Sequence, residues 1–181
     1  MRIIGAVLLL SASALLGFSA SGELKARVRD LELLIVSFEF MERELNAHLP
    51  PLLELLRRAS QVTSGYVKSF YLLTVLGMDR QTEQSFPELW KEAAEASQMH
   101  ITDHDLRIVC DVGLVLGRFD SVSQCSALTE AKGRLSLALK DAKEQKNNMG
   151  RVYSTLGIAS GALLSIILLF NSMQRYTVGT S

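Results

Sequence analysis

The side chains in this 181-residue chain that could carry out chemistry are three histidines and two cysteines. His100 and His104 stand one helical turn apart, but zinc needs three or four ligands and His48 does not lie at a spacing that completes a set. We expect the histidine pair, which flanks a predicted helix start, to be solvated. Cys110 and Cys125 are expected to be small apolar residues, buried or half-buried.

No other pattern in the sequence supports catalysis. The chain has no glycine-rich phosphate loop, no paired set of metal ligands and no serine, histidine and acid arrangement beyond chance. Its central segment, residues 22–151, carries 17 basic and 19 acidic residues, and this net charge of −2 argues against a nucleic-acid footprint. We therefore expect a protein that is not an enzyme, with no cofactor, metal or small-molecule substrate.

Two uncharged apolar stretches lie near the ends of the chain, and every acidic residue falls between them. The stretch from Ile3 to Ala20 has 18 residues and the stretch from Val152 to Phe170 has 19. Both are close to the ~20 residues with which a helix crosses a ~30 Å hydrocarbon layer. The sequence thus predicts an N-terminal transmembrane helix in residues 1–21, one domain in 22–151, a second transmembrane helix in 152–170, and a short tail in 171–181.

Basic residues near the two stretches predict the orientation, because such residues are held on the cytoplasmic side. Two basic residues, Arg2 and Arg175, lie outside the segment between the two stretches. Seven basic residues lie inside this segment next to the stretches, and the first of them is Lys25. The domain is therefore expected in the cytoplasm. The other six are expected to face the anionic inner leaflet: Arg27, Arg29, Lys140, Lys143, Lys146 and Arg151.

A second interpretation is a cleaved secretory signal. Met1-Arg2 is a short basic n-region, and Ser19-Ala20-Ser21 offers small residues at which a peptidase could cut. The domain would then be an exported, membrane-tethered binding or sensor domain. In the second apolar stretch, three small residues share one helical face, which favours close helix packing in lipid: Gly157, Gly161 and Ser165.

The apolar residues of the central segment recur with a helical period, and no strand pattern stands out. We expect an all-α fold, an antiparallel bundle of about six helices flanked by the two transmembrane helices, with both ends of the domain on one side. The expected ranges are Leu24–His48, Leu52–Gln61, Tyr66–Leu76 with Gly77 as a left-handed C-cap, Phe86–Ser97, Thr102–Val115, and a last helix that opens at Ser121.

Three capping boxes are predicted, at Ser85–Glu88, Thr102–Asp105 and Ser121–Gln124. Gly117, Asp120 and Gln124 are interpreted as a helix stop followed by a cap, in a loop that is also a candidate partner-binding surface. Trp90 is either a core residue or an exposed anchor for a partner helix.

The run Leu116-Gly117-Arg118-Phe119-Asp120, with Gln124 four residues later, precedes a long charged helix and a terminal apolar span that contains Leu156-Gly157. With Leu89-Trp90-Lys91-Glu92-Ala93 in the matching order, the chain resembles the stage III sporulation protein AB family of endospore-forming bacteria over residues 2–170. It departs from the family at Ala47 and at Pro50-Pro51-Leu52, where an aromatic residue and Thr-Pro-Leu are usual.

This resemblance implies a two-pass component of the mother-cell membrane facing the forespore, in a secretion-like apparatus that joins the two cells. The family's soluble domain is similar to the cytoplasmic domains of the type II secretion and type IV pilus platform protein F. The implied partners are the sporulation ATPase of the same operon, stage III sporulation protein AA, and other channel components.

Overall fold

The computed structural model describes the backbone of residues 2–80, 84–118 and 120–148, and the side chains of these residues from Gly22 onward. In these ranges the chain is helical and contains no strand, as predicted. The chain divides into two units, of which the larger is Gly22–Lys143, called the bundle below. The smaller unit consists of residues 1–21 and 144–181.

The two predicted membrane spans fall mostly outside these described parts. Residues 3–20 belong to the first helix, but their side chains are not described, and residues 152–170 lie beyond the described ranges together with Arg151, Gly157, Gly161 and Ser165. Among the described residues, no helix is both long enough and apolar enough to cross a membrane.

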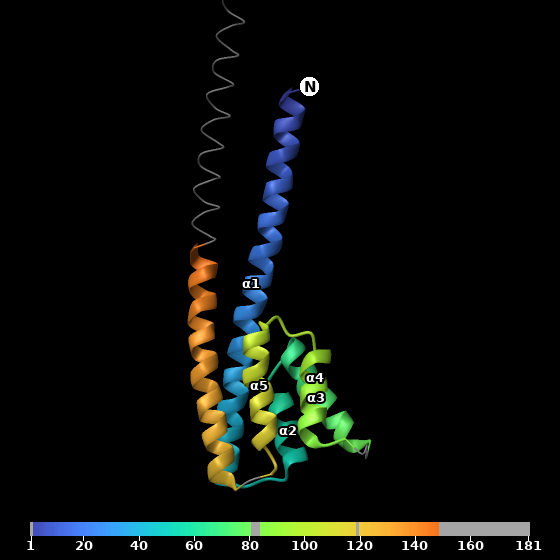
Figure 1. The fold of residues 1–181 in the computed structure, drawn as a ribbon, viewed down its shortest axis with the longest axis vertical. Coiled ribbons are helices and arrows are strands. Elements are labelled where there is room, and N and C mark those ends of the chain that lie inside the picture. The colour runs from blue at the N-terminus through green and yellow to red at the C-terminus, as the bar shows by residue number, and fades with distance from the viewer. Residues whose placement is uncertain (1, 81–83, 119, 149–181) are drawn as a thin grey trace, which may run out of the picture. The chain divides into compact units, whose positions relative to one another are not determined.

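The first helix of the bundle pairs with the last one. Helix α1 runs from Arg2 to Ala47, and a last helix covers residues 121–148; within the bundle, residues 22–47 lie beside residues 121–143 (Figure 1). Glu42 Oε1 accepts a hydrogen bond of 2.7 Å from the Thr129 hydroxyl, and Lys143 Nζ lies 2.7 Å from Glu32 Oε1. Late residues of one helix therefore contact early residues of the other, so the two run antiparallel. The part of α1 from Gly22 to Glu32 and the residues around Lys143 thus lie on one side of the bundle, which we call the terminal end, as predicted for the two ends of the domain.

At the opposite end, called the distal end, α1 stops and α2 (Leu52–Gln61) begins. Leu49 has a positive φ of 47°, which turns the chain out of the helix. Pro50 and Pro51 follow, and because proline has no backbone N–H it cannot continue a helix but can begin one. The predicted bounds of α2 are confirmed.

The remaining helices pack in chain order, α2 on α3, α3 on α4 and α4 on α5. Helix α3 (Gly65–Asp79) is longer than predicted, and Gly77 lies inside it rather than capping it. A Cβ atom added at Gly77 would lie 2.9 Å from Leu89 Cδ2 of α4. The glycine therefore serves the close approach of α3 and α4, so the prediction of a left-handed C-cap is wrong.

Two predicted capping boxes are confirmed. At the start of α4 (Phe86–Ala96), the Glu88 carboxylate accepts a 2.8 Å hydrogen bond from the Ser85 backbone N–H. At the start of α5 (Asp103–Val115), the Thr102 hydroxyl accepts a 3.2 Å bond from the Asp105 backbone N–H. Each box satisfies backbone donors that a helix start leaves free.

The third box is not formed as predicted. Asp120, rather than Ser121, caps the helix of residues 121–148, because its Oδ1 accepts a 3.0 Å bond from the Ser123 backbone N–H. The Gln124 amide oxygen turns back to accept a 3.2 Å bond from the Gly117 backbone N–H. A carboxylate one residue earlier thus supplies the cap, and the glutamine side chain supports the preceding loop.

Trp90 lies at the centre of the core and is fully buried. Its ring centroid is 4.5 Å from that of Phe70 and 6.1 Å from that of Tyr71, both in edge-on geometry, and its Nε1–H donates a 2.8 Å bond to the Val109 carbonyl. Gly113 of α5 faces the indole, where a Cβ atom would lie 2.3 Å from Cδ1. Trp90 is therefore a core residue, and the alternative of an exposed anchor is wrong.

Candidate functional site

Most of the predicted membrane-facing cations are exposed at or near the terminal end of the bundle. Arg29 makes a 3.3 Å contact with the Ser64 hydroxyl, and Lys143 pairs with Glu32, but both remain exposed. The other described members of the set that are exposed are Lys140 and Lys146. Lys25, which also lies in the first turn of the bundle, is exposed as well.

Arg27 differs from these residues. Its side chain is 17% exposed, and its Nε and Nη2 donate bonds of 3.3 and 3.0 Å to Oδ2 of Asp105, a carboxylate that is 1% exposed. The same oxygen accepts the Thr102 backbone N–H at 3.0 Å. Asp105 Oδ1 is buried without a hydrogen-bond partner among the described residues. Arg27 thus compensates a buried charge, so its assignment as a membrane-facing cation is wrong.

A second buried carboxylate lies at the terminal end. Asp30 is 3% exposed, and its Oδ2 accepts a 2.8 Å bond from the His100 backbone N–H and lies 3.3 Å from His100 Nδ1. The His100 ring also stands edge-on to Tyr66, with 5.0 Å between centroids. The His100 side chain is still 36% exposed, so the expectation of a solvated His100 is confirmed in part, whereas His104 is exposed as expected.

Both buried aspartates were missed by the sequence analysis as residues that join helices. A signal for them existed, since Asp30 lies four residues before the buried Leu34, and Asp105 lies three before the buried Ile108. Each acid thus stands in register with an apolar stripe. Their partners could not be found this way, because the partner of Asp30 lies 70 residues away in the sequence and that of Asp105 lies 78 away.

At the distal end, the interpretation of a helix stop followed by a cap is confirmed. Gly117 has a φ of 74°, and a Cβ atom there would lie 2.6 Å from Leu52 Cδ2 of α2. The backbone N–H and hydroxyl of Ser123 bond to the Asp120 carboxylate and hold its pKa below its ordinary value. The loop is thus fixed by glycine on one side and by a capped helix on the other.

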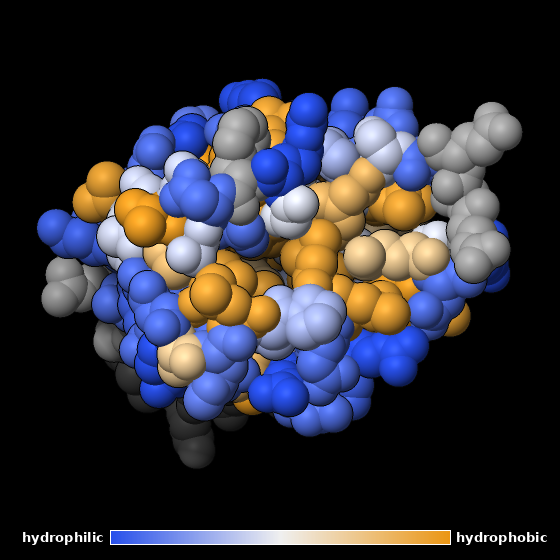
Figure 2. Space-filling view, turned by 90° about the horizontal axis from the view of Figure 1, so that it is seen from below, coloured by the Kyte–Doolittle hydropathy of each residue, from blue (hydrophilic) through white to orange (hydrophobic). Residues whose placement is uncertain are grey.

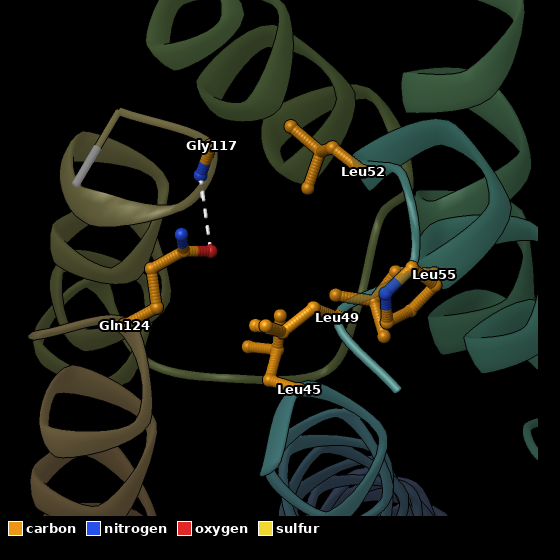
Figure 3. A pocket seen from close by; sticks show the side chains of 7 residues that line it. Leu45, Leu49, Leu52, Leu55, Gly117 and Gln124 are labelled. Carbon is orange, nitrogen blue, oxygen red and sulfur yellow. Dashed lines mark hydrogen bonds between the residues drawn. The ribbon is translucent and has the colours of Figure 1, made fainter. Parts of the chain in front are cut away.

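Beside this loop lies an apolar hollow of about 160 Å³, which we call the distal pocket (Figure 3). Its size suits one aromatic or leucine side chain, since a cavity of similar volume admits benzene. Figure 2 looks onto this end of the bundle and shows apolar side chains gathered across its middle, with hydrophilic ones around them. The pocket is lined by Leu45, Leu49, Pro50, Leu52, Leu55, Gly117 and Gln124.

Leu49 is the most exposed of the leucines in the lining, at 63%. Its left-handed backbone conformation costs a leucine roughly 1 kcal/mol. No lining residue is ionisable, so the pocket has no acid, base or nucleophile to offer a substrate. Its lining therefore offers mainly apolar contacts.

The cysteines form no reactive centre. Cys110 and Cys125 are free and half-buried, as predicted, and desolvation raises the pKa of both thiols, which keeps them protonated and unreactive. In the described part of the chain, no group of three or more histidine, cysteine or acidic side chains could hold a metal ion.

Comparison with known proteins agrees with the fold. The family model described as stage III sporulation protein AB matches residues 2–169. A solved structure of a stage III sporulation protein AB is similar, with a TM-score of 0.61 and 17% sequence identity over 68% of this chain and 98% of that chain. At that identity the likeness concerns the fold alone. A comparison with curated proteins finds no match.

Proposed function

Because the chain belongs to the stage III sporulation protein AB family, we propose that it is a non-enzymatic membrane component of the channel apparatus that joins mother cell and forespore. Two spans, residues 3–20 and 152–170, anchor it in the mother-cell membrane that faces the forespore. The bundle lies in the cytoplasm, with its terminal end seated on the inner leaflet.

The observation that carries this proposal is the geometry of the terminal end. The antiparallel pairing of α1 with residues 121–143 places Lys143 beside Glu32, on the half of α1 that begins at Gly22. Lys25 and Arg29 of α1 and Lys140 of the antiparallel helix are exposed in these segments. Each well-placed Lys or Arg gains about 1 kcal/mol at an anionic leaflet, so the terminal end is suited to rest on such a surface.

The distal pocket is proposed as the contact for the cytoplasmic ATPase that the family implies, stage III sporulation protein AA. The pocket lies at the end of α1 that is far from Gly22. The 25 residue steps of helix from Gly22 to Ala47 span roughly 38 Å. The membrane would therefore not obstruct it. An exposed leucine beside an apolar hollow of this size also resembles the packed centres at which protein interfaces concentrate binding energy.

Seating is tested with the full-length chain in nanodiscs, by hydrogen exchange of the terminal end with increasing anionic lipid. We expect protection to rise for the native chain and to be lost when Arg29 and Lys140 are both changed to Glu. The matched control for the double change Arg29→Glu with Lys140→Glu reverses two exposed cations away from the terminal end, Arg43→Glu and Arg118→Glu. Equal protection in both variants would refute the seating.

The ATPase contact is tested by titrating purified stage III sporulation protein AA onto the same nanodiscs. Leu49→Asp should weaken binding at least about tenfold, as substitutions at interface centres commonly do. Leu137→Asp is the control, because Leu137 is 67% exposed and lies on the helix of residues 121–148, outside the pocket lining. If both substitutions have the same effect, the pocket is not the contact.

A further inference from the structure

Helix α3 is apolar on its outer face as well as on its inner face. Four large apolar side chains on the outer side are well exposed: Tyr66 at 44%, Leu72 at 41%, Leu73 at 38% and Leu76 at 51%. The inner side of the same helix is buried, through Val67, Phe70, Tyr71, Thr74 and Val75. A helix that is apolar all round is normally covered on every side. Among the described residues, the His100 ring packs on Tyr66, whereas Leu72, Leu73 and Leu76 stay open to solvent.

A groove runs between this face and α4. Its floor is apolar, formed by Leu73 and Leu76 of α3 and by Leu89 and Ala93 of α4, and it encloses about 170 Å³. Gly77 keeps it narrow at its base, because α3 and α4 can approach closely there. We call this surface the α3 groove.

The charges around the α3 groove are uneven. Lys68 and Arg80 are exposed near the two ends of α3, and neither forms an ion pair with any residue that the structure describes. They lie 12 residues apart, or ~18 Å along a helix. The one carboxylate of the lining, Glu92, already accepts a 3.2 Å bond from the Gln84 amide. Arg80 of the lining and Lys68 beside it on α3 thus give this surface two cations without an ion pair against one carboxylate, Glu92, whose bond to the neutral amide leaves its charge in place.

We propose that the α3 groove binds an acidic amphipathic helix of another protein. The apolar stripe of that helix covers Leu73 and Leu76, and two of its carboxylates, spaced by about three turns, pair with Lys68 and Arg80. This surface is distinct from the distal pocket and adds a lateral partner to the bundle.

A second copy of this chain is the less suitable occupant. The contacts Arg29–Ser64 and Ser37–Tyr71 show that α3 runs parallel to α1. Two copies in one membrane, related by a two-fold axis along that direction, would set each Arg80 against another Arg80. This argument against a second copy assumes the membrane seating proposed above. The like charges of such a pair would repel.

The test uses the full-length chain in zwitterionic nanodiscs and a fluorescent helical peptide of about 18 residues. The peptide carries a leucine stripe and two glutamates about 12 positions apart, and a matched peptide carries lysines instead. We expect the glutamate peptide to bind about tenfold more tightly, because two exposed pairs change from attraction to repulsion and each contributes a few-fold. Changing both Lys68 and Arg80 to Glu should invert the preference.

Leu73→Asp should abolish binding of both peptides, whereas Leu137→Asp, on another helix, should leave binding unchanged. Emission from Trp90 reports that each variant is folded. Equal affinity of the two peptides, equal binding to empty nanodiscs, or a dimer that Leu73→Asp dissociates would each overturn the proposal. The readout does not depend on which side of the membrane the bundle occupies, so it fails or succeeds independently of the topology.

Discussion

Replacing Arg27 by alanine should destabilise the bundle strongly. The substitution removes both bonds that the guanidinium donates to Asp105 Oδ2 and leaves a carboxylate that is 1% exposed without its counter-charge. The second oxygen of Asp105 has no partner among the described residues, so it supplies no compensation. The backbone N–H of Thr102 would be the remaining donor.

Breaking a buried ion pair by removal of one partner costs about 3–5 kcal/mol. Arg27 is partly accessible to water, which lowers the expected loss to the lower end of that range, about 3 kcal/mol. With a urea dependence of about 1–3 kcal/mol per molar for a domain of this size, the midpoint should fall by roughly 1–3 M.

The assay is urea unfolding of the full-length chain in mild detergent, followed by the emission of Trp90, the single tryptophan of the chain, which is fully buried. Arg29→Ala is the matched control, because Arg29 lies two residues further along α1 and makes only an exposed contact with Ser64. Its midpoint should move by less than the equivalent of about 1 kcal/mol. If Arg27→Ala shifts the midpoint no more than the control does, the buried pair is not a structural support.

Three further outcomes are expected in the same unfolding assay. Gly113→Ala should lower stability by about 1–3 kcal/mol, because its methyl group would collide with the Trp90 indole, and an unchanged midpoint would contradict this packing. Asp120→Ala should cost about 1 kcal/mol through loss of the cap; a cost no greater than that of an exposed control substitution would argue against that role. The pKa of Glu42 is lowered by hydrogen bonds from Lys132 and Thr129, so its contribution is present above the ordinary value of 4.5 and is lost as pH falls through the lowered one. The Glu42→Gln variant should therefore lose less unfolding free energy than the native chain when the pH falls from 7 to 3. Equal losses in the two proteins would show that ionised Glu42 does not stabilise the bundle.

Helix bounds could be predicted wherever the controlling residues are neighbours in the chain. Pro51 before α2, the box at Ser85 before α4 and Gly117 after α5 each act within a few residues of themselves. Gly77 was misjudged because its role depends on Leu89 of another helix. Local signals thus located the helices, while a glycine needed for packing between helices looked like a glycine that ends one.

The candidate surfaces were only partly predictable for the same reason. Charge placement near the predicted spans located the exposed cations of the terminal end, since exposure of a lysine needs no partner. It could not separate Arg27 from Arg29, because the distinction depends on Asp105, 78 residues further along the chain. The distal pocket and the α3 groove also arise from segments that meet only in the folded chain.

The central claim is that the bundle lies in the cytoplasm between two membrane-crossing helices. Reporter enzymes that are active on only one side of the membrane, fused after Lys68 and at Ser181, test it directly in living cells. The account predicts a cytoplasmic signal from the fusion after Lys68 and an external signal from the fusion at Ser181. An external signal after Lys68 would contradict it and would favour export of the domain behind a cleaved signal.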